Sequence, residues 1–107
     1  MKLKEERRVF VRYPCNFKVS GIVLNKDIEF AAQTFNISAE GLGLKTQEKL
    51  IPGDNIEIWI HLKGDAAPLH TYGKIMWIRK VINEYKVGVK FDSLHLLPLG
   101  VALEKNI

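Results

Sequence analysis

The sequence predicts an all-β fold, a barrel or sandwich of six antiparallel strands, and three observations support this prediction. Residues 56–62 alternate between apolar and polar side chains, which is the pattern of a strand with one buried and one wet face. Six apolar stretches follow one another at short spacing, separated by turns that contain Gly, Pro, Asn or Asp. No long stretch shows the period of a helix, so we expect neighbouring strands to pair directly.

The predicted strands cover residues 16–24, 28–35, 41–45, 56–62, 69–81 and 85–91. Residues Asn36–Gly41 are expected to form a loop after the second strand, and residues 82–84 a turn in the last hairpin. Gly41 and Gly43 open the third strand and indicate a bulge or a place where another surface comes close to the backbone.

The tail from Leu94 to Ile107 is first apolar and then charged. It is expected to form a short C-terminal helix that is capped near Ser93 or begins at Pro98, although Gly100 is unfavourable to a helix. No internal repeat and no low-complexity segment interrupts the chain.

Length and composition indicate one soluble domain. A chain of 107 residues with 47% apolar and 26% charged residues is ordinary for such a domain. No apolar run approaches the ~18 residues of a membrane span, and the charged N-terminus lacks the apolar core of a signal peptide. The single Cys15 permits neither an internal disulfide nor a cysteine zinc cluster. We expect a cytoplasmic protein that does not insert into membranes.

The positive charge of the chain is concentrated near its N-terminus. The net charge is +4, and residues 1–12 hold five Lys or Arg against two Glu, which is +3. We expect residues 1–12 to be a flexible arm and residues 13–107 to be the barrel domain. Cations gathered on one short arm favour a compact anionic ligand over a long nucleic acid, which binds cations spread along a face.

The arm carries Arg7, Arg8 and Arg12, and the last two stand four positions apart in the pattern R-x-x-x-R. The planar guanidinium donates two parallel hydrogen bonds, which suits it to phosphate and to the acceptor edge of guanine. Taken alone, such a basic run is more often a solvated surface.

A second motif consists of Asn36, Ser38 and Gly41, in the pattern N-x-S-x-x-G. Asn and Ser side chains bond nearby backbone groups and hold tight turns, while Gly permits a positive φ or the close approach of a ligand. On spacing alone, a plain turn between two strands is the simpler interpretation.

Together the two motifs resemble those of the PilZ domain, the bacterial receptor module for cyclic diguanylate. In that family R-x-x-x-R is followed further along the chain by D/N-x-S-x-x-G. Residues 73–77 and 87–91 also resemble the late hairpin of the family, so the resemblance covers nearly the whole chain. It implies a PilZ-like β-barrel of six antiparallel strands with a short C-terminal helix.

The resemblance implies a role for each motif residue in binding cyclic diguanylate. Arg8 and Arg12 are implied to clamp phosphate and guanine, by bidentate hydrogen bonds and by stacking on the base. Asn36 is implied to contact a guanine edge. Ser38 is implied to contact the ligand or the backbone through its hydroxyl, and Gly41 to leave room for the ligand.

Arg7 stands directly before the first motif. For an arginine in this place the resemblance implies the binding of a stacked pair of ligand molecules, so that two molecules of cyclic diguanylate bind to one chain. The alternative is a solvated Arg7 and a single ligand. No further cofactor and no metal is expected.

The resemblance implies a signalling sensor rather than an enzyme. We expect the chain to bind cyclic diguanylate and to relay the signal, through ordering of the arm, to an unidentified protein effector. Motility and biofilm formation are processes that such domains serve. We expect no DNA or RNA partner, and a monomer or weak homodimer.

Two other functions stay open. One is a PilZ-like module that binds only protein and no nucleotide. The other is a small barrel for single-stranded nucleic acid, which requires aromatic and basic residues interleaved on one exposed face. The strand patterns place Glu57, Asp92 and scattered lysines there instead.

Three histidines and the cysteine are assigned no catalytic role. The histidines are too scattered for a metal site and are expected to be solvated: His61, His70 and His95. Cys15 is expected to be a small core residue.

The two tryptophans are expected to differ in their surroundings. By alternation Trp59 faces outward, where either another part of this chain or a partner covers it. Trp77 is expected in the core or at its rim, rather than as a stacking platform.

Overall fold

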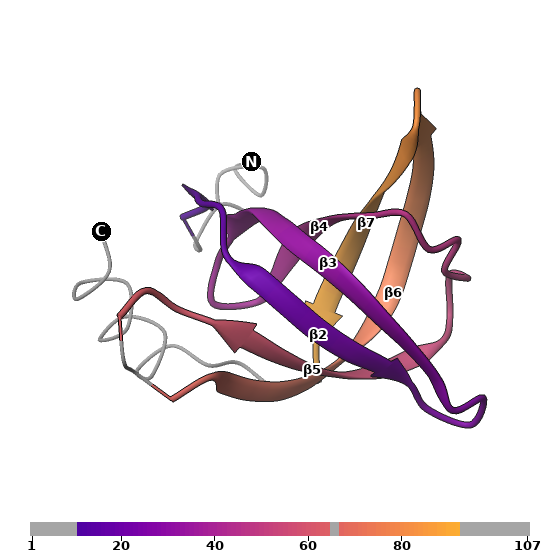
Figure 1. The fold of residues 1–107 in the computed structure, drawn as a ribbon, viewed down its shortest axis with the longest axis horizontal. Helices are drawn as coiled ribbons and strands as arrows, with labels where there is room; N and C mark the ends of the chain where they lie inside the picture. The colour runs from indigo at the N-terminus through magenta and orange to yellow at the C-terminus, as the bar shows by residue number, and fades with distance from the viewer. Residues whose placement is uncertain (1–10, 65–66, 93–107) are drawn as a thin grey trace, which may run out of the picture.

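The computed structural model describes residues 11–64 and 67–92, which form seven strands (Figure 1). The strands are β1 (Tyr13–Pro14), β2 (Lys18–Val23), β3 (Ile28–Ile37), β4 (Gly41–Thr46), β5 (Asn55–His61), β6 (Leu69–Val81) and β7 (Glu84–Phe91). Their order is β1-β3-β2-β5-β6-β7-β4, and β4 also pairs with β3, so β2 to β7 close into an antiparallel barrel of six strands. The predicted barrel is confirmed over the sandwich.

The six predicted strands agree with β2 to β7 to within two residues at each end. The helix predicted in the tail lies outside the described residues. None of the described residues belongs to a helix that is long and apolar enough to cross a membrane.

The inside of the barrel is filled by apolar side chains that alternate along the strands. In β5, Ile56, Ile58 and Ile60 are each 0% exposed, as the alternation over 56–62 predicted. The other barrel strands add residues such as Val19 and Leu44 to the same core. Because side chains fill the interior of so small a barrel, a ligand has to bind at its outer face or its ends.

A short strand that the sequence did not predict, β1, extends the sheet beside the end of β3. Tyr13 lies opposite Ile37, and Pro14 lies opposite Asn36. Proline has no N–H group, and it is tolerated here because the pairing is short and lies at an edge. β1 therefore fixes the chain that follows Arg12 against the end of β3.

The connection between β3 and β4 is shorter than the predicted loop. β3 continues through Ile37, β4 begins at Gly41, and Asn36 is paired with Gly43. Only residues 38–40 form the turn. The third strand begins at Gly41, as predicted, but the loop prediction was wrong at its N-terminal end. There, pairing between the strands, which the local sequence does not reveal, extends β3 by two residues to Ile37.

The hairpin of β6 and β7 extends beyond the barrel wall (Figure 1). Its turn is Ile82 and Asn83, between the paired residues Val81 and Glu84. β6 pairs with β5 only over residues 69–74, whereas its pairing with β7 continues to Val81.

Alanine substitutions at Gly41 and Gly43, both in β4, compare how much the stability of the barrel depends on the close contacts at each glycine. A Cβ at Gly41 would lie 2.1 Å from the carbonyl oxygen of Val89, which the β7 backbone holds in place. A Cβ at Gly43 would lie 2.4 Å from the tip of the Phe35 ring, which can turn aside. We expect Gly41→Ala to lower the free energy of unfolding by about 1–3 kcal/mol, the usual cost of overpacking, and Gly43→Ala to lower it less. Urea denaturation measures both, and equal losses would contradict the packing argument.

Candidate functional site

An open pocket of about 430 Å³ lies on the outer face of the barrel, over β3, β4, β6 and β7. It brings together three of the residues that the two motifs predicted: Arg12, Asn36 and Gly41. The rest of its described lining combines aromatic, aliphatic, charged and glycine residues: Phe35, Glu40, Leu42, Gly43, Met76, Trp77, Arg79, Gly88, Val89 and Lys90. Both sequence motifs therefore meet at one concave surface.

A β-bulge in β3 turns two consecutive side chains toward this pocket. The pairing of β3 with β4 shifts between Thr34 and Asn36. An extra residue in one strand lets two neighbouring side chains face the same way before the alternation resumes. Thr34 and Ile37 are accordingly buried, at 1% and 0% exposure, while Phe35 and Asn36 between them line the pocket.

A second bulge does the same in β6. The pairing of β6 with β7 shifts between Ile75 and Trp77. Ile75 is fully buried and Ile78 packs against the core, whereas Met76 and Trp77 are 50% and 43% exposed and line the pocket. Trp77 thus lies at the rim, which is one of the two places expected for it.

The floor of the pocket is formed by two aromatic rings that lie over a pair of glycines. Gly43 lies opposite Gly88 on β4 and β7. A Cβ on Gly43 would meet the Phe35 ring at 2.4 Å, and a Cβ on Gly88 would meet the Trp77 indole at 2.2 Å. The close approach predicted at Gly43 is confirmed. A floor made of two aromatic rings suits the face of a planar ligand.

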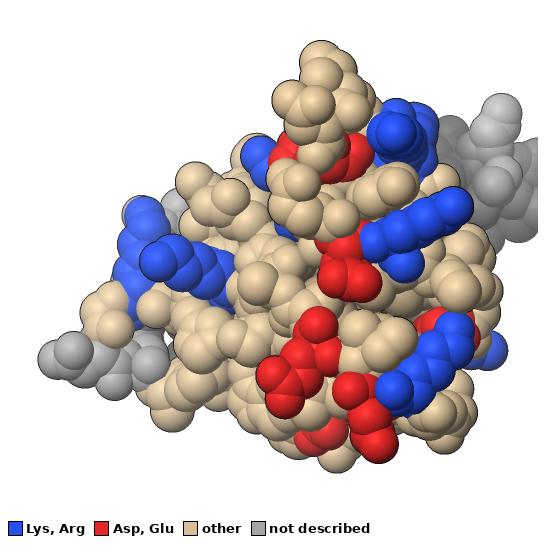
Figure 2. Space-filling view, turned by 45° about the vertical axis from the view of Figure 1, so that its right-hand side comes forward, with Lys and Arg blue, Asp and Glu red and all other residues tan. Residues whose placement is uncertain are grey.

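Cationic side chains surround this floor. Arg12, Arg79 and Lys90 line the pocket, with Glu40 as the acidic residue of the described lining. The guanidinium carbon of Arg79 is 5.7 Å from the centre of a Trp77 ring. The face shown in Figure 2 intersperses acidic and basic side chains. The pocket lining has a net positive charge, which favours an anionic ligand.

Asn36 presents an unused hydrogen-bond acceptor. Its side-chain oxygen Oδ1 is buried and has no hydrogen-bond partner among residues 11–64 and 67–92. A buried polar atom left without a partner costs about 1–3 kcal/mol, and such atoms are uncommon in folded proteins. A ligand N–H group that reached Oδ1 would remove this cost.

Ser38 and Gly41 shape the turn between β3 and β4. The Ser38 N–H donates to the Gly41 carbonyl at 2.8 Å. The Ser38 hydroxyl donates to the same carbonyl at 3.4 Å and accepts from the Glu40 N–H at 3.3 Å. Of the two contacts implied for Ser38, the backbone contact is therefore the one present. Gly41 does line the pocket, but the Val89 carbonyl already occupies the place of its missing side chain.

Thr34 anchors the chain that leads from Arg12 into the barrel. Its hydroxyl accepts from the Phe17 N–H at 2.7 Å and lies 3.2 Å from the Cys15 sulfur. Burial raises the pKa of the half-buried Cys15 thiol, and the hydrogen bond with Thr34 opposes this rise. These contacts hold the segment after Arg12 in place. Arg7 and Arg8 lie outside the described residues.

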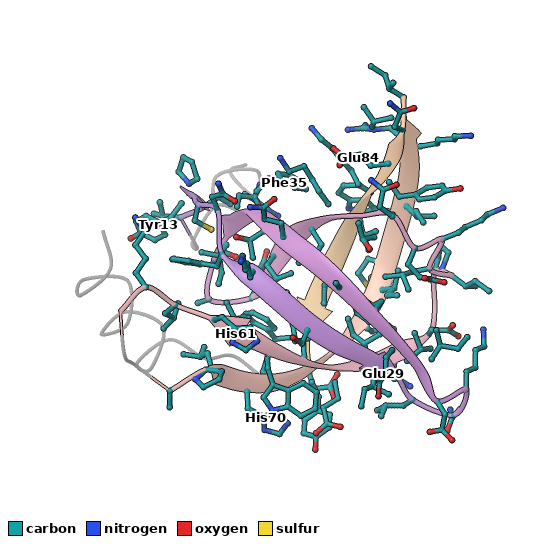
Figure 3. All side chains as sticks on the ribbon, in the orientation of Figure 1. Tyr13, Glu29, Phe35, His61, His70 and Glu84 are labelled. Carbon is teal, nitrogen blue, oxygen red and sulfur yellow. The ribbon has the colours of Figure 1, made fainter. Side chains whose placement is uncertain are left out.

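A second cluster lies across β5 and β6, on the side of the barrel away from Phe35 (Figure 3). The His70 ring stacks on Trp59 at 5.0 Å, and its Nε2 is 2.7 Å from the Glu57 carboxylate. The Tyr72 hydroxyl also donates to Glu57, and this bond together with the charge of Glu57 raises the pKa of Tyr72. His70 thus partly covers Trp59 from within the chain.

The remaining histidines do not extend this cluster into a metal site. His61 is exposed and lies 3.2 Å from the Ser20 hydroxyl, and His95 lies outside the described residues. Over residues 11–64 and 67–92, no three His, Cys, Asp or Glu side chains gather as metal ligands.

Known proteins share this fold. The family model of the PilZ domain matches residues 6–97, while a search of curated proteins gives no match. The Bacillus subtilis inhibitor of motility MotI/DgrA has a TM-score of 0.74 and 17% identity, with 92% of this chain and 49% of that chain covered. The PilZ domain of Escherichia coli YcgR, solved with c-di-GMP, has a TM-score of 0.71 and 16% identity, with 94% and 88% covered.

A third structure, the PilZ domain of CeSA from a cellulose-synthesizing bacterium, has a TM-score of 0.59 and 18% identity, with 89% and 92% covered. This chain therefore spans about half of MotI/DgrA but most of the two isolated PilZ domains. At these identities the solved structures show the fold. Because the family model extends over residues 6–97 and includes both motifs, the chain belongs to the PilZ domain family.

Proposed function

We propose that this chain binds cyclic diguanylate in the outer pocket and that Arg8 and Arg12 close over the ligand. The observation that carries the proposal is the buried Oδ1 of Asn36, which has no partner in the described part of the chain and belongs to a residue that lines the same pocket as Arg12. PilZ domains form a family of receptors for this nucleotide, and the YcgR domain of similar fold was solved with it.

The chemistry of the ligand matches the lining group by group. A cyclic dinucleotide offers two phosphates, two purine faces and the O6 and N7 acceptors of guanine. Arginine addresses all three, by ion pairing, by stacking and by bidentate hydrogen bonds. Guanine also carries N–H donors on its pairing edge, and these are the groups that the Asn36 oxygen would accept.

The proposed site includes three residues that the sequence motifs did not indicate: Phe35, Trp77 and Arg79. The rings of Phe35 and Trp77 lie over the glycine pair, so a guanine laid on this floor would contact aromatic carbon. Such base–aromatic contacts contribute about 1–3 kcal/mol each. Arg79 lines the same pocket beside Trp77 and supplies a positive charge to a phosphate.

The proposed relay is supported by the contacts of the segment that follows Arg12. Residues 15–17 are held to β3 through Thr34, and β1 pairs with the end of the same strand. Movement in response to ligand is therefore assigned to residues 1–12, which carry the three arginines. The ordered arm changes the surface beside the pocket, and a protein effector reads that change.

Single-stranded nucleic acid is a second candidate ligand, because the fold brings aromatic and basic side chains together that the strand patterns did not place on one face. Phe35, Trp77, Arg79 and Lys90 share one outer surface, and aromatic rings among cations are the usual platform for unpaired bases. Binding of any oligonucleotide, with affinity that falls steeply as salt rises, would favour this function over a dinucleotide sensor.

Removal of either clamp arginine should weaken binding of cyclic diguanylate by about ten- to a hundredfold, since a charge-assisted hydrogen bond contributes about 1.5–3 kcal/mol. Isothermal titration of Arg8→Ala and Arg12→Ala measures this. Lys63→Ala is the control, because it removes the same charge from an exposed residue outside the pocket lining. If either arginine variant binds like the wild type, that residue is not part of the clamp.

Arg7 sets the number of ligands in this proposal. An additional guanidinium can stack on the outer guanine of a second, stacked ligand molecule. The same titration should then reach two ligands per chain for the wild type and one for Arg7→Ala. One ligand per wild-type chain would show that Arg7 is solvated.

Asn36→Leu should stabilise the fold and at the same time weaken the binding of cyclic diguanylate. Leucine has the shape of asparagine without its polar atoms, so the substitution removes the unpaired acceptor and should raise the free energy of unfolding by up to about 3 kcal/mol. The same change should weaken cyclic diguanylate binding about tenfold. Asn36→Asp keeps an acceptor and should retain binding. A leucine variant that binds like the wild type would remove Asn36 from the site.

A further inference from the structure

The outer edge of β6 has no strand beside it over most of the projecting hairpin. β5 pairs with β6 only as far as Lys74. Ile75 then bonds to the preceding turn, donating its N–H to the Asp54 carbonyl at 2.9 Å and accepting from the Gly53 N–H at 2.7 Å. From Met76 to Val81, no strand of residues 11–64 or 67–92 pairs with this edge.

The register identifies the backbone groups that face the open edge. Val81 and Glu84 close a two-residue turn, so they form the hydrogen-bonded pair of the hairpin. Along an antiparallel ladder such pairs alternate with pairs whose N–H and C=O groups point away from each other. The next pair, Lys80 with Tyr85, and then Ile78 with Val87, are of this second kind. Lys80 and Ile78 therefore present their backbone groups to the open edge.

The tip of the hairpin carries an unusual residue. Ile82 is 84% exposed and has a φ of 51°, in the left-handed region that a β-branched side chain rarely adopts. At the other end of the open edge, Met76 and Trp77 are also exposed. Exposed apolar side chains thus stand at both ends of an unpaired strand, an arrangement found where another chain adds to a sheet.

The charges of this edge decide what can pair with it. Its ionisable residues are Arg79 and Lys80. Antiparallel pairing with a second copy would bring two such dipeptides together, and like charges on facing strands are unfavourable. Residues 93–107 hold one Glu and one Lys, so they do not supply a complementary acidic strand either. A strand rich in carboxylates would pair its side chains with both cations.

We infer that the open edge of β6, residues 76–81, docks an extended acidic segment of a partner protein by strand addition. Backbone groups of Ile78 and Lys80 bond the incoming strand, its carboxylates face Arg79 and Lys80, and its apolar ends contact Trp77 and Ile82. This docking needs no nucleotide. Only its control by ligand rests on the proposed function, because Trp77 and Arg79 also line the pocket.

The probe is a fluorescein-labelled peptide with the core sequence Val-Val-Glu-Glu-Val-Val, titrated into the full chain without nucleotide and followed by anisotropy. Its two adjacent carboxylates lie on opposite faces of the strand, as Arg79 and Lys80 do, and its ends are apolar. Two matched peptides are controls: one with N-methyl groups on alternate backbone nitrogens, and one with Lys in place of Glu. Saturable binding of the first peptide alone is expected. Equal binding of the N-methylated peptide would indicate a charged patch and overturn strand addition, as would no binding of any peptide.

Two substitutions at Lys80 separate the contribution of its backbone N–H group to peptide binding from that of its side-chain charge. Lys80→Ala removes one exposed ion pair and should lower the affinity for the peptide by no more than about fivefold. Lys80→Pro removes the same charge and also the edge N–H, which a proline can lack without breaking the β7 ladder. Lys80→Pro should therefore lower the affinity for the peptide by a further factor of about ten. Equal effects of the two substitutions would contradict the proposal.

Hydrogen exchange of single amides gives a readout that does not depend on variants. The added peptide should slow exchange at Ile78 and Lys80 and leave Arg79 and Val81, which already face β7, unchanged. Slow exchange at Ile78 and Lys80 before peptide is added would mean that the chain covers its own edge. Concentration-dependent dimers that Lys80→Pro abolishes would assign the edge to a second copy. Either result would overturn the proposal that this edge docks an acidic partner.

Discussion

The outer pocket depends on two β-bulges, one in β3 and one in β6. With strict alternation after Thr34, Asn36 would point into the apolar core and Ile37 would face water, because one residue of slip reverses every side chain that follows. The bulge keeps Ile37 at 0% exposure and still turns Phe35 and Asn36 outward. In β6 the same device keeps Ile75 and Ile78 on the core and sends Trp77 to the surface.

This constraint ties the binding surface to the stability of the barrel. The core holds the strands in register, and the register holds the aromatic rings over Gly43 and Gly88. The pocket floor is therefore preorganised, and the segment that follows Arg12 is joined to the barrel through β1 and the Thr34 contacts. Under the proposed function, recognition would rely on this floor and the response on the arginine arm.

Local periodicity was sufficient to predict the barrel strands, because each has one apolar face that the closed barrel must bury. The strict alternation of Ile56, Ile58 and Ile60 predicted β5 almost to the residue. The motifs also indicated that Arg12 and Asn36 belong to one site, and they line one pocket. These predictions needed only the side-chain pattern along one segment or a spacing that the PilZ family shares.

What could not be predicted depends on register between strands that are distant in sequence. Phe35 and Trp77 are 42 positions apart in the chain (77 minus 35), and they flank one floor only because Gly43 pairs with Gly88. The same holds for the contact of Gly41 with the Val89 carbonyl and for the bond between His70 and Glu57. No local pattern marks the bulges at Phe35–Asn36 and Met76–Trp77, so Trp77 was expected in the core or at its rim rather than as a stacking platform.

The most direct test of the bulge-built pocket is tryptophan fluorescence during titration with cyclic diguanylate. Trp77 borders the pocket, whereas Trp59 lies in the cluster on β5 and β6. In Trp59→Phe, which leaves Trp77 as the single indole, the ligand should change the emission along the same saturation curve that calorimetry gives. In Trp77→Phe, which leaves Trp59, emission should stay constant. A response that belongs to Trp59 and not to Trp77 would contradict the account, because the ligand would then bind on the other side of the barrel.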